Sequence, residues 1–163
     1  MNGDEIPDPH HVMRFVPKKY LIPDEEGNPT GGIRPEAFQL KPKDEGRLSV
    51  TWLEYFAGDH PVQRVAAVKA TRASLTVKPR DGFAVGQVGQ IKARCASRRH
   101  QIRVVHAPVD SNKAHAELLQ LPKNETILLE ELATGEWSTL VFNSAVEAGV
   151  MSAPEAAAFQ PTQ

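Results

Sequence analysis

The sequence predicts an α+β fold, a small, mostly antiparallel sheet with a central helix near residues 61–73 and a helical C-terminal third. The order of the segments predicts this class, because a strand and a helix precede several strand-like runs, and helices follow them. The 11 glycines and 13 prolines are spread over the connecting segments, which suits a small sheet with irregular loops. No internal repeat or heptad pattern suggests another class.

The length of 163 residues suits one domain. Residues 1–10 are polar, contain two prolines and are predicted to form a flexible N-terminal tail. Residues 11–151 are predicted to form the single α+β domain. Residues 152–163 are predicted to be a C-terminal tail or a short terminal helix.

The N-terminal part of the domain is predicted to contain two strands. Residues 11–16 alternate loosely and predict the first strand, and residues 48–55 alternate clearly and predict the best one. Between them, residues 23–35 are dense in turn-forming side chains and predict a long loop. Residues 36–40 are predicted to form one helical turn.

A helix is predicted to follow the second strand and to end near residue 73. Asp59 suits the N-cap, and Pro61 suits the first turn, where its missing N–H costs nothing. Val62, Val65 and Val68 recur at helical spacing, so this helix is predicted to be amphipathic.

The middle of the chain is predicted to be mostly strand. Short β-favouring runs lie at residues 75–78, 83–88, 91–95 and 102–106, with a turn at 79–82. Residues 97–100 are predicted to join the last two runs as a hairpin.

The C-terminal third is predicted to be helical. Ser111 or Asn112 would cap a helix over residues 114–121, and Asn124 would cap a second one over residues 125–134, which Gly135 ends. Residues 137–142 fit either a strand or part of a further helix.

Composition excludes several classes of protein. Hydrophobic residues are 40%, charged residues are 24%, and no apolar run approaches the roughly 20 residues of a membrane span. No secretory signal is expected, and the single cysteine, Cys95, excludes an intramolecular disulfide framework or a Cys-based zinc cluster. We therefore expect a soluble, cytoplasmic protein with no membrane partner.

Charge is segregated along the chain. Residues 1–60 carry 7 basic and 11 acidic side chains, residues 61–115 carry 11 and 2, and residues 116–163 carry 1 and 7. The basic middle could pair with the acidic ends inside the fold, or it could form a basic face for phosphate or an acidic partner. The candidate binding residues are Lys92, Arg94, Arg98, Arg99, Arg103, Arg64 and Arg72.

A glycine motif lies within this basic block. Gly86-Gln87-Val88-Gly89, with Ile91-Lys92 behind it, resembles the GXXG loop of KH domains, which clamps nucleic-acid backbone. Here the apolar residue follows the second glycine one position too early, and β-favouring residues flank the motif. We therefore expect a strand–turn–strand or a bulged strand, where glycine allows a close backbone approach, rather than a KH domain.

A second candidate site combines two histidines and an amide. His106, Asn112 and His115 lie within one predicted strand–loop–helix, so both imidazoles could face one cleft, with Asp110 nearby. That set would suit general acid–base catalysis, or a metal with two nitrogen ligands and Asp110, although the spacing matches no recognised ligand pattern. Alternatively, the loop side chains are turn and capping residues.

A third set has a distant counterpart. Arg14, Ser49-Val50-Thr51 and Glu130-Glu131 are similar in order and type to the arginine, Ser-x-Ser/Thr and glutamate elements of ADP-ribosyltransferases. The resemblance implies an arginine that holds phosphate or ribose, a hydroxyl-bearing strand in a nicotinamide pocket, and a glutamate that serves the transfer. No Glu-x-Glu or Gln-x-Glu motif is present, and the acidic pair lies on a predicted helix.

Cys95 has two interpretations. Its basic neighbours in the sequence would favour a reactive thiolate, whereas its β-favouring context is typical of a small buried apolar residue.

The favoured function is a small binding or accessory module whose basic face contacts nucleic-acid phosphates or an acidic protein partner, alone or within a larger complex. An alternative is a small enzyme for a nucleotide-like or phosphorylated substrate, with His106, Asn112 and His115 at its site and help from Arg14 and Glu54. A second alternative is a non-enzymatic subunit of a protein complex, of the immunity type. No cofactor and no metal site are predicted.

Overall fold

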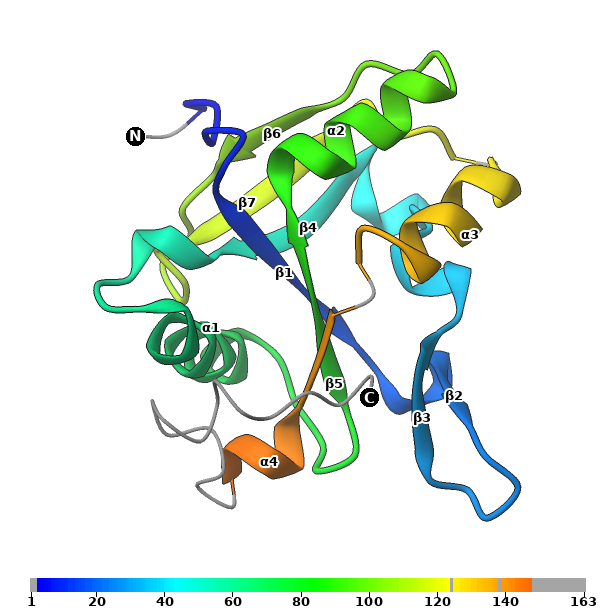
Figure 1. The fold of residues 1–163 in the computed structure, drawn as a ribbon. Coiled ribbons are helices and arrows are strands. Elements are labelled where there is room, and N and C mark those ends of the chain that lie inside the picture. The colour runs from blue at the N-terminus through cyan, green and yellow to red at the C-terminus, as the bar shows by residue number, and fades with distance from the viewer. Residues whose placement is uncertain (1–2, 124, 138, 148–163) are drawn as a thin grey trace.

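The computed structural model describes residues 3–123, 125–137 and 139–147, which form an α+β fold built on one six-stranded sheet (Figure 1). The strand order is β6-β7-β4-β1-β5-β8, and every pairing is antiparallel. The strands of this sheet are β1 (His11–Val16), β4 (Arg47–Trp52), β5 (Gly82–Gln87), β6 (Arg103–His106), β7 (His115–Leu119) and β8 (Thr139–Phe142).

The connections contain a separate hairpin and several helices. The hairpin consists of β2 (Leu21–Pro23) and β3 (Pro29–Ile33). The α-helices are α1 (His60–Ser74), α2 (Val88–Ser97), α3 (Thr126–Thr134) and α4 (Asn143–Glu147). Single 3₁₀ turns are η1 (Lys18–Tyr20), η2 (Pro35–Phe38), η3 (Pro42–Asp44) and η4 (Leu53–Tyr55).

Helices cover both faces of the sheet. Strand side chains alternate between the faces, and apolar side chains on each face pack against helices. On one face, Met13 and Val85 pack with Ala67 and Val68 of α1. On the other, a larger core gathers Val12, Val16 and Val50 with the apolar stripes of α2 and α3, and Phe38 of η2 stacks on Trp137 with ring centroids 5.1 Å apart. The sheet is therefore the middle layer of the molecule.

The ladder between β1 and β4 is short. Strand β1 pairs with β5 over six residue pairs, but with β4 only at Val12↔Trp52 and Met13↔Thr51. Beyond Met13 the two strands diverge, and η2 and the segment that follows it lie beside the gap (Figure 1). This divergence leaves a fork in the middle of the sheet.

The N-terminal segment covers one edge of the sheet. The Ile6 N–H donates to Val104 O at 2.9 Å, the His106 N–H donates to Asp4 O at 2.8 Å, and Glu5 bridges Val105. Part of the segment expected as a flexible tail therefore lies along β6. An edge strand covered in this way has fewer exposed backbone groups that could pair with another chain.

Several predictions from the sequence are confirmed. The class is α+β with an antiparallel sheet, β1 and β4 lie where strands were predicted, and Gly135 follows α3. The Asp59 carboxylate caps α1 by accepting the Val62 N–H at 3.2 Å. Residues 139–142, left open between strand and helix, form the edge strand β8.

The predicted hairpin, in which residues 97–100 join runs 91–95 and 102–106, is wrong, because residues 88–97 form helix α2. Val88, Ile91 and Cys95 lie at helical spacing and are all buried, so burial of that stripe outweighs the β-favouring composition. The first N–H groups of α2 are also satisfied, since Val88 N–H donates to His10 O and Gly89 N–H to Asp8 O.

The predicted helix over residues 114–121 is also wrong. The segment is β7, in which Ala116 and Leu118 are buried while His115, Glu117 and Leu119 are half-buried. Pairing with β4 on one side and β6 on the other outweighs the helix-forming composition.

Two further predictions from the sequence, a long loop at residues 23–35 and a strand at residues 75–78, are wrong. The long loop predicted at residues 23–35 contains most of the β2–β3 hairpin, and residues 75–78 are not a strand. The tail or helix predicted at residues 152–163 lies outside the described residues.

Within the described ranges, no helix combines the length and apolarity that a membrane crossing requires.

The two-sided core makes a prediction about α3. We expect Leu132→Ala to lower the free energy of unfolding by about 2–5 kcal/mol, because Leu132 is 0% exposed in the larger core. The matched control is Ile127→Ala on the same helix, where the side chain is 59% exposed and the change should stay within about 0.5 kcal/mol. Urea unfolding of both variants measures the difference, and equal losses would contradict the assigned face of α3.

Candidate functional site

A cavity of about 480 Å³ opens at the fork between β1 and β4. We call it the Arg14 pocket. Strands β1, β4 and β7, the end of α1, η1, η3 and the loop before β7 contribute its lining. The polar side chains of the lining that matter below are Arg14, Lys41, Asp44, Thr51, Asn112 and His115.

The Arg14 guanidinium lies in the fork and donates to backbone carbonyls on two sides of it. Its Nε donates to Ala37 O at 3.1 Å, and its Nη1 donates to Ser49 O at 2.9 Å. The Ser49 carbonyl lies on β4 beyond the last residue pair of the β1–β4 ladder. The Arg14 side chain thus bonds a backbone carbonyl that β1 itself would have paired with in a longer ladder. Both acceptors are neutral, and Arg14 makes no ion pair with any residue that the structure describes.

Burial shifts the pKa of Arg14. Loss of solvent lowers the pKa of its guanidinium from the usual value, while Asp44 and Tyr20 act in the opposite direction. The group remains cationic, because an arginine pKa starts far above neutral pH. A half-buried cation without a carboxylate partner therefore faces the pocket.

Lysines add positive charge at the same place. The ammonium groups of Lys19 and Lys41 lie 5.0 and 5.1 Å from the centroid of the Tyr20 ring. Lys43 also lines the cavity, whereas Asp44 is the only carboxylate among the described lining residues. The Asp44 carboxylate accepts the backbone N–H of Lys41 at 2.7 Å. One of its oxygens is therefore already hydrogen-bonded within the turn η3.

The opposite wall is held by polar side chains that bond to one another. Asn112 Nδ2 donates to Thr51 Oγ1 at 3.1 Å, and its Oδ1 accepts the Ala114 N–H at 3.0 Å. The Ser74 and Ser111 hydroxyls lie 2.7 Å apart and join the end of α1 to the loop before β7. These bonds give the cavity a fixed wall.

The three predicted catalytic candidates do not meet in one cleft. Because His106 pairs with Ala116, the alternation along β7 puts His106 and His115 on opposite faces of the sheet. Asn112 and His115 line the Arg14 pocket, and His115 Nδ1 lies 2.7 Å from Ala107 O. His106 is buried beside the Trp52 ring instead, with its Nε2 2.7 Å from Lys113 O.

Three of the predicted basic binding residues are ion-paired. Lys92 lies 2.9 Å from Asp8, Arg94 lies 3.1 Å from Glu136, and Arg98 lies 2.8 Å from Glu131. The Arg98 guanidinium holds the pKa of the Glu131 carboxyl below its usual value. Parts of the basic middle thus pair with both acidic ends of the chain.

The remaining basic candidates differ in their surroundings. Arg72 donates to Asn143 Oδ1, at 2.6 Å from Nη2. Arg64 is half-buried, its Nε has no hydrogen-bond partner among the described residues, and burial lowers its pKa. Arg99 and Arg103 are exposed, and neither forms an ion pair within the described part of the chain.

Packing explains the glycine motif. Gly86 lies close to the backbone carbonyl of Glu136. A Cβ added to Gly86 would lie 2.9 Å from that oxygen. A Cβ on Gly89 would lie 3.1 Å from Asp8 O. The motif spans the junction of β5 and α2, so the expected strand–turn–strand or bulged strand is wrong. Both glycines do permit the close backbone approach that was expected.

The residues that resemble ADP-ribosyltransferase elements are only partly brought together. Arg14, Ser49 and Thr51 all line the Arg14 pocket. Glu130 and Glu131 lie on α3, which packs on the larger core, and Glu131 pairs with Arg98. The glutamate element of that resemblance is therefore absent from the pocket lining.

The sequence did not reveal the lysines and the tyrosine of the pocket. Lys41 and Lys43 lie in a polar connection, and Tyr20 follows the first strand, so none belongs to a spaced motif. Only the short β1–β4 ladder brings them to Arg14, and no local pattern encodes that ladder.

Comparison with known proteins adds no relative. A scan against protein-family models, a search of curated proteins and a search of solved structures each returned no match to this chain.

Cys95 provides a test of the described packing. Burial, with a smaller contribution from Glu136, raises the pKa of its thiol to about 11, so the reactive thiolate is scarce near neutral pH. We expect a thiol reagent at about pH 8 to modify the native protein far more slowly than the urea-unfolded chain. Equal rates in the two states would show that α2 does not shield this side chain.

Proposed function

We propose that the protein binds a small phosphate-bearing molecule in the Arg14 pocket. One observation carries the proposal: the Arg14 guanidinium faces the cavity with neutral carbonyls as its only described hydrogen-bond partners. A negatively charged ligand would supply the counter-charge.

The energetics of Arg14 favour an anion. Transfer of a cation out of water is costly, and neutral acceptors satisfy its N–H groups without compensating its charge. The lowered pKa of Arg14 reflects this loss of solvent. An oxyanion in the pocket would form charge-assisted hydrogen bonds to the guanidinium, whose planar fork suits phosphate.

The rest of the lining supports a phosphate ester rather than a bare ion. Lys19 and Lys41 hold two further positive charges beside Tyr20, which suits a ligand with more than one negative charge. Met13 and Phe15 contribute apolar surface for an organic portion. The volume of about 480 Å³ falls within the roughly 300–1,000 Å³ of small-molecule sites.

Binding is favoured over catalysis, because the described lining pairs no nucleophile with a base. The Ser74 hydroxyl contacts Ser111, Thr51 accepts from Asn112, and Thr71 donates to the Ala67 carbonyl. His115 Nδ1 lies within hydrogen-bond distance of the Ala107 backbone carbonyl. These contacts suit a rigid wall better than an activated hydroxyl.

The test uses inorganic pyrophosphate at constant ionic strength as the probe. We expect pyrophosphate to raise the melting temperature of the wild-type protein, because a ligand that binds only the folded state stabilises it. Arg14→Met should weaken binding about tenfold or more, since a hydrogen bond to a charged group contributes roughly 1.5–3 kcal/mol. Calorimetric titration measures both dissociation constants.

The control is Arg103→Met, which removes the same charge from an exposed position on β6. It should bind pyrophosphate as the wild type does. The proposal fails if the wild-type protein does not bind the probe, or if Arg14→Met and Arg103→Met weaken binding equally. Circular dichroism of the Arg14 variant checks that the fork still folds.

A second candidate function keeps the favoured expectation from the sequence, a basic surface that contacts nucleic acid or an acidic protein. The observation in its favour is that Arg99 and Arg103 are exposed and form no ion pair within the described part of the chain. Together they offer a smaller surface than the seven basic candidates in the sequence.

For this surface, we expect Arg99→Ala with Arg103→Ala to abolish any salt-sensitive binding of short RNA and DNA, measured at two salt concentrations. Arg98→Ala serves as the matched control, because its guanidinium is already paired with Glu131. No binding by the wild-type protein at low salt would exclude nucleic acid as the ligand of this surface.

A further inference from the structure

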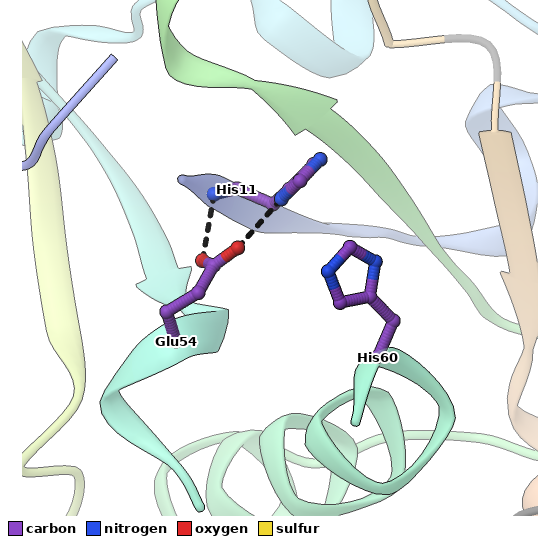
Figure 2. Close-up of side chains that lie close together, drawn as sticks. All are labelled: His11, Glu54 and His60. Atoms are coloured by element: carbon purple, nitrogen blue, oxygen red, sulfur yellow. Dashed lines mark hydrogen bonds and ion pairs between the residues drawn. The ribbon is translucent and has the colours of Figure 1, made fainter. Parts of the chain in front are cut away.

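We propose that His11, Glu54 and His60 form a binding site for a divalent transition-metal ion such as Zn²⁺ (Figure 2). Each residue offers one ligand atom, and these atoms all lie within 4.8 Å of one another. The site is independent of the Arg14 pocket, since none of the three residues lines that cavity.

Three separate elements bring the ligands together. His11 begins β1, Glu54 lies in the turn η4 directly after β4, and His60 is the first residue of α1. Figure 2 shows the Glu54 carboxylate beside His11, with the His60 ring facing them from the start of the helix. The rings of His11 and His60 meet edge to face, with centroids 4.9 Å apart.

The carboxylate is already oriented. One oxygen of Glu54 accepts the backbone N–H of His11 at 2.7 Å, and the other lies 2.6 Å from His11 Nδ1. The backbone bond fixes the rotamer, so the second oxygen and the imidazole are held in place without a metal. Such preorganisation lowers the entropic cost of forming a metal site.

The dimensions allow a metal between the ligands. Zinc binds imidazole nitrogen and carboxylate oxygen at about 2.0–2.2 Å, which puts neighbouring ligand atoms about 3.4 Å apart in a tetrahedral site. His11 Nδ1 and Glu54 Oε2 would separate by less than about 1 Å, as the metal takes the place of the proton that they share. The imidazole would then carry its proton on Nε2.

The donor set selects the kind of ion. Two imidazoles and one carboxylate suit zinc, copper, nickel or iron, whereas magnesium and calcium prefer sites built of oxygen atoms. The side chains of His11 and Glu54 are 24% and 16% exposed, and His60 is exposed, so an ion can enter from solvent. Three protein ligands leave a fourth position for water or another small ligand.

The chain offers a variant that separates a metal site from a structural His–Glu bond. In His60→Ala the contacts between His11 and Glu54 remain, so their structural role is preserved. The matched control is His100→Ala, because His100 also lies near a carboxylate, 3.9 Å from Glu125. Within the described residues, His100 belongs to no cluster of three metal-ligating side chains.

The experiment titrates Zn²⁺ into the metal-free protein by calorimetry. We expect one ion per chain in the wild type and in His100→Ala. We expect affinity at least about 100-fold lower in His60→Ala, since loss of an outer-shell partner already costs roughly 10–100-fold. Arg14→Met should bind zinc normally, which separates this site from the pocket.

Two results would overturn the proposal. The first is no zinc binding by the wild-type protein. The second is equal affinity in the wild type and His60→Ala, which would assign the ion to other side chains. A melting temperature that zinc raises in the wild type and leaves unchanged in His60→Ala gives an independent readout of the same site.

Discussion

The shortness of the β1–β4 ladder is the constraint on which the rest of the molecule depends. Only two residue pairs join these strands, and a side chain replaces the ladder at each end. At one end, Glu54 accepts the His11 N–H, and at the other, Arg14 donates to Ser49 O. Both candidate sites lie at these two ends, because polar side chains enter the sheet where its backbone groups lack a strand partner.

Strand β1 can carry both sites because its other edge is fully paired. Its six pairs with β5 hold the strand in place, and its alternating apolar residues pack with α1 on one face and with α2 and α3 on the other. The polar ends of the strand are therefore presented by a rigid element, which favours precise geometry in a binding site. The acidic ends of the chain have a different role, since they pair with Lys92, Arg94 and Arg98.

Local patterns predicted the class, β1, β4 and the capped helix α1, because each has a signal within a few residues. They failed at α2 and β7, where tertiary burial outweighs intrinsic preference. Arg14 and Asn112 were singled out, but as members of different sets. Their meeting in one pocket, with Lys41 and Tyr20, depends on where two distant strands part, and no local pattern encodes that point.

The most direct test of this account is the exchange rate of the Arg14 Nε–H, measured by nuclear magnetic resonance with and without pyrophosphate. The bond to Ala37 O predicts slower exchange for Arg14 than for exposed Arg99 and Arg103, and a shift of its resonance when pyrophosphate binds. Exchange as fast as that of the exposed arginines, with no shift on titration, would contradict both the fork and the pocket.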